Sequence, residues 1–231
     1  GLSLDRPLVM GVVNVTPDSF SDGGDFADPQ LAIDHGLRLR GEGADIVDIG
    51  GESTRPGAAP LDPAEEIRRV VPVVSALALA GAVVSIDTRH SAVMRAALAA
   101  GATIVNDVTA LTDAGAIDAV RDAGAAAVLM HMQGDPGTMQ KEPRYDDVVG
   151  EVAAWLAARV AACVAGGIAH ERIAIDPGIG FGKTVAHNLA LLAATERFVA
   201  TGLPVLIGVS RKSFIARLSA ETDVRAGETV P

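Results

Sequence analysis

Short runs rich in Val, Ile and Leu alternate along this chain with longer Ala-rich segments of helical periodicity. This alternation is typical of βα units, because neighbouring parallel strands are joined by a crossover that usually contains a helix. The chain is therefore predicted to have an α/β fold with a parallel sheet. Seven candidate strands are visible: LVMGVVNV (8–15), ADIVDIGG (44–51), VVSIDT (83–88), TIVNDV (103–108), AAVLMHM (126–132), IAIDPGIG (173–180) and PVLIGVS (204–210). The helical segments between them include residues 29–43, 62–81, 90–101, 113–124 and 146–167.

A polar residue stands at or near the C-terminal end of each candidate strand. Such residues converge only if the strands are parallel and surround a common axis, as on the active face of a (β/α)8 barrel. A doubly wound open sheet is the alternative, but its ligand groups gather at one switch point. A (β/α)8 TIM barrel is therefore preferred. The polar residues are Asn14, Asp48, Asp87, Asn106, His131, Asp176 and Ser210, with Lys212 just beyond.

The last part of the barrel is expected to be missing. The chain stops at Pro231, shortly after the seventh helix-like segment 213–221, so no residues remain for an eighth strand and helix. We therefore expect one domain over residues 1–231 that is C-terminally incomplete, and less stable and less active than an extended chain would be.

The composition argues against some classes of binding partner and indicates the cellular compartment. With 231 residues and 49% hydrophobic content the chain can bury a substantial core, and its formal charge of -10 argues against a nucleic-acid or anionic-membrane surface. The apolar stretch 70–84 is interrupted by Pro72, Ser75 and Gly81 and is shorter than the about 20 residues of a membrane span. No secretory pattern opens the chain, and the single Cys163 cannot form an internal disulfide, so a cytoplasmic location is expected.

Several loops indicate chemistry. The polar loop VNVTPDSFSDGG (13–24) follows an apolar run and carries one aromatic residue, whereas GGESTRPGA (50–58) has the composition of a mobile anion-binding loop. The loop DPGIGFGKT (176–184) lacks the spacing of a phosphate-binding P-loop, and close approach to a flat ring is the better interpretation. His131 has no His or Cys partner at metal-ligand spacing, and no Ser-His-Asp arrangement is present.

The converging carboxylates need partners, because several of them close together would repel one another. A ligand that donates hydrogen bonds, or a cation, would relieve this repulsion. Arg55, Arg211 and Lys212 are donors near the same strand ends. Such a mixture suits a planar heterocycle with both donor and acceptor edges.

Seven motifs together resemble the dihydropteroate synthase family of pterin-binding barrels. They occur in the family's order over residues 9–215, and they are MGVVNVTPDSFSDGG, IVDIGGESTRPGA, SIDT, IVNDV, LMHMQGDPGTMQ, IDPGIGFGKT and GVSRKSFI. The resemblance implies a TIM barrel. It also implies a transferase of folate biosynthesis that joins p-aminobenzoate to 6-hydroxymethyl-7,8-dihydropterin pyrophosphate, with Mg²⁺ as cofactor and sulfonamides as inhibitors.

By this resemblance, Asp176 takes the amino and ring N–H groups of the pterin, and Asp87, Asn106 and Lys212 satisfy its other polar edge. Asp48 lies in the same site. The remaining substrate-binding residues are implied to be Thr54, Pro56, Met130, Phe181, Gly208 and Ser210.

The resemblance also assigns the pyrophosphate and the lid. Asn14 and Arg55 match positions that handle the pyrophosphate, and Asn14 and Asp87 are the expected Mg²⁺ ligands. In the loop 13–24, Phe20 is placed beside p-aminobenzoate and Asp22 near the developing positive charge. The expected catalytic residues are therefore Phe20, Asp22, Arg55 and Lys212.

The implied mechanism needs no enzyme nucleophile, since the pyrophosphate leaves first and the dihydropterin delocalises the resulting cation. The family also implies a homodimer, provided that the C-terminus is complete. Two alternatives remain: a pterin-dependent methyltransferase barrel, and a catalytically weak or silent paralogue that binds pterin.

Overall fold

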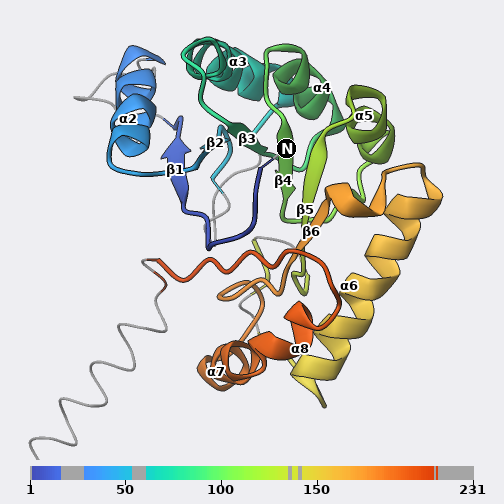
Figure 1. Cartoon of the computed structure of the whole chain (residues 1–231). Helices are drawn as coiled ribbons and strands as arrows, with labels where there is room; N and C mark the ends of the chain where they lie inside the picture. Colours follow the sequence, from blue (N-terminus) through green and yellow to red (C-terminus); the bar gives the residue numbers. More distant parts are fainter. Residues whose placement is uncertain are drawn as a thin grey trace, which may run out of the picture.

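Six parallel strands form one sheet in the order of the sequence. The computed structural model describes residues 2–16, 29–53, 61–134, 137–139, 142–210 and 212. The sheet order β1-β2-β3-β4-β5-β6 means that each strand pairs with the next one along the chain. The strands are β1 (Met10–Asn14), β2 (Ile46–Gly50), β3 (Val84–Asp87), β4 (Ile104–Asp107), β5 (Ala126–Met130) and β6 (Ile173–Asp176) (Figure 1).

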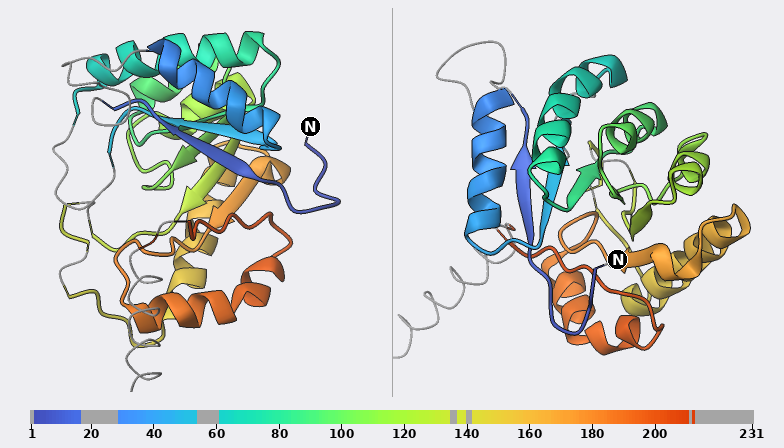
Figure 2. Two further views of the ribbon diagram at one scale, coloured as in Figure 1. Left: turned by 90° about the vertical axis from the view of Figure 1, so that its left-hand side faces the viewer. Right: turned by 45° about the horizontal axis from the view of Figure 1, so that its top comes forward.

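Helices connect successive strands and lie on the outside of the curved sheet, following one another around it in chain order (Figure 2). The helical segments predicted from periodicity are confirmed, with ends a few residues shorter. The helices are α2 (Pro29–Gly41), α3 (Pro63–Leu79), α4 (Ser91–Ala99), α5 (Ala116–Ala123), α6 (Val148–Ala165), α7 (Val185–Ala193) and α8 (Thr195–Val199), with a short 3-10 turn at His170–Arg172.

Local sequence fixes where several helices begin. Asp62 caps α3 by accepting hydrogen bonds from the backbone N–H groups of Ala64 and Glu65, and Pro63 follows at the first helical position. Thr184 and His187 form a reciprocal capping box at the start of α7. These caps fix the points at which the loops after the strand ends give way to helix.

The core lies mainly between the strands and the surrounding helices. Ile49 on β2, Ile86 on β3 and Leu77 on α3 are fully buried in one apolar cluster that joins strands to helices. All five residues of β2 are buried, as expected for a strand covered on both faces.

The seventh candidate strand pairs over a shorter length than predicted. Val205 forms an isolated parallel bridge with Ile175, and the N–H of Leu206 donates to the Ile175 carbonyl at 2.9 Å. The described part of 204–210 thus lies beside β6 in the direction a barrel requires. Within the described ranges, β1 pairs in the sheet only with β2.

Helix α6 is the most apolar long helix of the described chain. Its 18 residues have a mean hydropathy of 1.7, so by length and composition alone it could cross a membrane. This helix was missed as a candidate span from the sequence, where only 70–84 stood out, a stretch that covers the end of α3 and the start of β3. Core helices of soluble proteins can have similar compositions; in α6, 22% of the residues are buried, and they include Leu156 and Cys163 of the core. The absence of a membrane partner stays a prediction.

Candidate functional site

The predicted strand residues share the inner face of the curved sheet. Ile46, Ile104 and Val128 form a small apolar cluster against which Met10, Val83 and Ala174 also pack. Side chains two or four residues further along a strand point to the same face. This face therefore ends, toward the C-terminal edge, in Asn14, Asp48, Asp87, Asn106, Met130 and Asp176.

Asp48 and Asn106 form a direct hydrogen bond across the intervening strand β3. The Asn106 Nδ2 donates to Asp48 Oδ2 at 3.0 Å. Burial raises the pKa of Asp48, and the neighbouring Ser85 hydroxyl and Asn106 amide oppose this rise. The pair places a carboxylate and an amide side by side, as expected for a ring with mixed donor and acceptor edges.

Asn14 and Asp87 flank a glycine in the same row of the sheet. Gly50 is the Cα partner of both Asn14 and Asp87. A Cβ atom at Gly50 would lie 3.6 Å from Asp87 Oδ2 and 3.8 Å from Asn14 Oδ1. Glycine thus leaves a space that a carboxylate oxygen and an amide oxygen both border. These are the ligand atoms that Mg²⁺ prefers, so the residues present fit this ion.

The surroundings of Asp87 are strongly negative. Burial raises the pKa of Asp87 well above its ordinary value, and the nearby carboxylates of Asp48, Asp107, Glu66 and Glu52 raise it further. A cation or a hydrogen-bond donor from a ligand would favour the ionised form. Asp87, at the end of β3, is therefore the carboxylate that most needs a cation or a hydrogen-bond donor as a partner.

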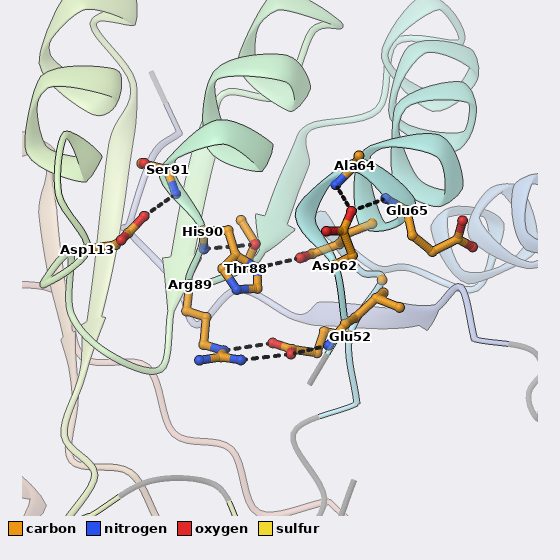
Figure 3. A network of polar contacts seen from close by, with 12 residues as sticks. Glu52, Asp62, Ala64, Glu65, Thr88, Arg89, His90, Ser91 and Asp113 are labelled. Carbon is orange, nitrogen blue, oxygen red and sulfur yellow. Dashed lines mark hydrogen bonds and ion pairs between the residues drawn. The ribbon is translucent and has the colours of Figure 1, made fainter. Parts of the chain in front are cut away.

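A polar network next to this strand end joins Glu52, Glu66, Arg89 and His90. Figure 3 shows Glu52, Arg89 and His90 of this network. Arg89 donates from Nε and Nη2 to the two carboxylate oxygens of Glu52 at 2.8 and 2.9 Å. His90 Nδ1 lies 2.8 Å from Glu66 Oε2, while the buried Glu66 Oε1 has no hydrogen-bond partner in the described structure. Sequence reasoning missed this network.

Glu52, Glu66 and His90 have the spacing of a metal site, with ligand atoms within 4.8 Å of one another. However, the Arg89 guanidinium already neutralises Glu52 through two hydrogen bonds. We therefore interpret the cluster as an ion-pair network that supports the loops after β2 and β3. It is the only such group among the described residues.

Asp176 ends β6 in a buried position. Its Oδ1 accepts a hydrogen bond of 2.7 Å from the N–H of Gly178, whose φ of +69° suits glycine. Burial raises the pKa of Asp176 to about 6, against the opposing effects of the Gly178 N–H and of the charges on Lys183 and Lys212. A carboxylate with this environment remains able to accept donors from a ligand.

Lys212 reaches the same region from beyond the seventh segment. Its Nζ lies 4.1 Å from the centre of the Phe181 ring, a cation–π contact. Burial lowers the pKa of Lys212, while the negative charges of Asp176 and Asp87 oppose this effect. The structure thus places Lys212 near Asp176 and Asp87. The Phe181 ring, which was predicted to stack on a substrate, contacts Lys212.

The other predicted residues are placed less closely or not at all. Gly208 and Ser210 are exposed on the segment after Val205, and Met130 is buried beside Asp176, its Cα partner. Phe20, Asp22, Thr54, Arg55 and Pro56 lie outside the described residues. All these roles stay predictions.

Lys183 is a buried residue of this region that sequence reasoning left out. Its Nζ contacts His131 Nδ1 at 3.1 Å and donates to the carbonyls of His131 and Phe181 at 3.2 and 2.9 Å. The usable signal was a lysine directly after the glycine-rich turn that follows β6. Lys183 was left out because the loop 176–184 lacks the spacing of a P-loop, in which this lysine would have had a role.

Comparison with known proteins identifies the family. The sequence profile of the family described as "Pterin binding enzyme" matches residues 10–230. The chain is 53% identical over 229 residues to the dihydropteroate synthase of Neisseria meningitidis serogroup C, covering 97% of this chain and 81% of that protein. The chain belongs to the dihydropteroate synthase family. The family member of Escherichia coli K12 is 48% identical over 218 residues, covering 94% of this chain and 77% of that protein.

Solved dihydropteroate synthase structures have the same fold. The Xanthomonas albilineans enzyme with 4-aminobenzoic acid matches with a TM-score of 0.89 and 53% identity, over 95% of this chain and 78% of that one. Its complex with 7,8-dihydropteroate matches with a TM-score of 0.85 and 48% identity, over 97% and 82%. The Yersinia pestis dihydropteroate synthase with a sulfonamide drug has a TM-score of 0.89 and 46% identity, over 95% and 80%. The predicted family and α/β barrel fold are confirmed.

Proposed function

We propose that this dihydropteroate synthase family member condenses p-aminobenzoate with 6-hydroxymethyl-7,8-dihydropterin pyrophosphate to give 7,8-dihydropteroate and pyrophosphate. The observation that carries the proposal is the buried Asp176 beside Lys212 on the inner face of the barrel, in a chain 53% identical to a dihydropteroate synthase. Relatives with 4-aminobenzoic acid and with 7,8-dihydropteroate support both ends of the reaction.

The proposed pterin contacts follow from the chemistry of the site. A pterin presents an amino group and a ring N–H side by side, and the ionised Asp176 carboxylate can accept from both in addition to Gly178. A ring lacking these donors would leave a buried carboxylate unpaired, so the site discriminates against it. Asp87 and the Asp48–Asn106 pair are proposed to contact the remaining polar edge.

In the proposed reaction, the bond between the pterin methylene carbon and the pyrophosphate oxygen breaks, and its electron pair leaves with the pyrophosphate. The amine nitrogen of p-aminobenzoate then forms a bond to that carbon and releases a proton to solvent. The carboxylates of Asp87 and Asp176 stabilise positive charge on the pterin, since they lie on the same face of the barrel. Lys212 offers a positive charge near both.

Mg²⁺ is the proposed cofactor. Asn14 and Asp87 would hold it, because their oxygens border the space left by Gly50. When bound, Mg²⁺ would neutralise negative charge on the pyrophosphate.

Product formation tests the proposal. The purified chain is incubated with both substrates and Mg²⁺, and dihydropteroate is measured by liquid chromatography and mass spectrometry. We expect product in proportion to time and enzyme, its loss when EDTA removes Mg²⁺, and inhibition by a sulfonamide that competes with p-aminobenzoate. Binding of a pterin without any product would instead support the silent paralogue. The relatives named above are dihydropteroate synthases. Methyl transfer from a methylated pterin is the assay that tests the methyltransferase alternative.

A further inference from the structure

Lys183 joins two loops of the site from a buried position. It is only 4% exposed, and its ammonium contacts His131 on the loop after β5 and the Phe181 carbonyl on the loop after β6. An ammonium group has three N–H donors, and these three contacts account for all of them. Any effect of Lys183 on a ligand must therefore pass through the groups around it.

We propose that Lys183 is a positioning residue of the pterin site, which locks the loop after β6 against His131 and uses its positive charge to keep Asp176 ionised. This inference rests on the proposed function. In this proposal Lys183 contacts neither substrate. It sets the charge and the position of Asp176, the main acceptor for the pterin.

The contact with His131 requires a neutral imidazole. The protonated Lys183 ammonium has no lone pair with which to accept a hydrogen bond, so while it is charged His131 Nδ1 must be the acceptor and carry no proton. Burial lowers the pKa of His131 to about 3, and the Lys183 charge contributes to this shift. The ring is also held edge-on against Trp155 at a centroid distance of 5.0 Å. The pair therefore carries one positive charge, located on the lysine.

The two loops meet without spare room around this ammonium. A Cβ atom at Gly178 would overlap with the His131 carbonyl oxygen and lie 3.2 Å from Lys183 Nζ. A Cβ atom at Gly182 would lie 2.7 Å from the Gln133 carbonyl oxygen, and the Tyr145 hydroxyl donates to the Gly182 carbonyl at 3.0 Å. The lock thus holds the segment that carries Phe181 and the Gly178 N–H that binds Asp176.

Two positive charges near Asp176 favour its ionised form. Its carboxyl faces Lys183 on its own loop and Lys212 from beyond the seventh segment, and both favour the ionised form. Burial lowers the pKa of Lys183 to about 7, while Asp176 opposes this shift and Lys212 adds to it. The other titratable groups described at the joint include His131, which is neutral, and Tyr145, against whose ring His187 packs edge-on at a centroid distance of 5.0 Å. The geometry places both groups at one turn, because a Cβ atom at Gly178 would lie 3.2 Å from Lys183 Nζ and the Gly178 N–H donates to Asp176 Oδ1 at 2.7 Å.

The test measures the titration of Asp176 directly. Aspartate is labelled with ¹³C at the carboxyl group, the Asp176 signal is identified by its loss in Asp176→Asn, and its midpoint is compared between wild type and Lys183→Met. We expect the midpoint to rise by about one pH unit in Lys183→Met, which converts to about tenfold weaker pterin binding below the midpoint. Calorimetry with 6-hydroxymethylpterin across pH should show the same displacement of the binding profile.

Control variants separate charge from packing. Arg144→Met removes an exposed positive charge from the loop after β5, and we expect it to leave the midpoint unchanged because solvent screens that charge. Lys183→Arg keeps the charge and should keep the midpoint close to that of wild type. If Lys183→Met does not fold, Lys183→Gln, which retains amide donors without the charge, gives the same readout.

An unchanged Asp176 midpoint in a folded Lys183 variant would overturn the inference. So would an affinity loss that is equal at every pH, because that result indicates packing alone. The carboxyl titration needs no pterin, so a wild-type protein that binds no pterin would contradict the proposed function while the titration still decides the role of the charge.

Discussion

Asp176 combines two opposing demands in one side chain. The ionised carboxylate suits the two parallel N–H donors of a pterin, yet it lies almost fully buried. We expect Asp176→Asn to weaken pterin binding by about 2 to 4 kcal/mol, because an amide N–H would face a donor of the ligand. Calorimetry with 6-hydroxymethylpterin at pH 8 measures this loss. Asp34→Asn on the exposed face of α2 is the matched control, and an equal affinity in both variants would remove Asp176 from the site.

The same carboxylate should make folding stability depend on pH. Its pKa is raised to about 6 in the folded protein, so between pH 4 and 6 the folded state binds more protons than the unfolded state. This contribution to stability is therefore present at pH 4 and is lost as the pH rises through 6. The shift corresponds to up to about 3 kcal/mol.

Asp176→Asn lacks this titration, so its stability relative to wild type should increase from pH 4 to pH 7. Urea unfolding of both proteins at the two pH values measures the difference. A constant difference would show that Asp176 has an ordinary pKa in the folded protein.

At the scale of elements, the site depends on how closely the loop after β6 approaches the end of β5. Gly178 and Gly202 both have positive φ, +69° and +79°, but only at Gly178 would an added Cβ atom have other atoms within 4 Å. We expect Gly202→Ala to cost about 1 kcal/mol of stability from backbone strain alone. Gly178→Ala adds an overlap with the His131 carbonyl and should cost on the order of 3 to 5 kcal/mol.

Thermal and urea unfolding of both variants test this difference, and residual pterin binding reports on the loop itself. Similar losses in the two variants would mean that the loop can move away from β5 at little cost. The result would then weaken the argument that Lys183 and His131 define a rigid joint.

At the scale of the whole molecule, the homodimer implied by the family stays a prediction. An apolar groove along α6, lined in part by Val160, Val164, Phe198 and Leu203, is a surface that a second copy could cover. Provided that the C-terminus is complete, we expect analytical ultracentrifugation to give a dimer, and Val164→Asp to shift it toward monomer. Leu79→Asp, at an exposed position on α3, is the control that should not. A monomeric wild-type protein with a complete C-terminus would contradict the dimer prediction. The predictions of a single domain and of a cytoplasmic location need separate tests.

The amino-acid sequence was enough to predict the order of strands and helices, the family, and the set of polar residues near the strand ends. It could do so because the period of two along a strand and the parallel direction of all strands place Asp48, Asn106 and Asp176 on one face without knowledge of any contact. The long motifs shared with the family then implied which substrates to expect. Which of these groups contact one another could be seen only in the folded chain. The Asp48–Asn106 bond spans 58 positions, and the contact between Lys183 and His131 spans 52. Burial, which raises the pKa of Asp176 and lowers that of Lys183, likewise depends on elements far apart in the chain, because desolvation is a property of the packed surroundings and not of the local sequence.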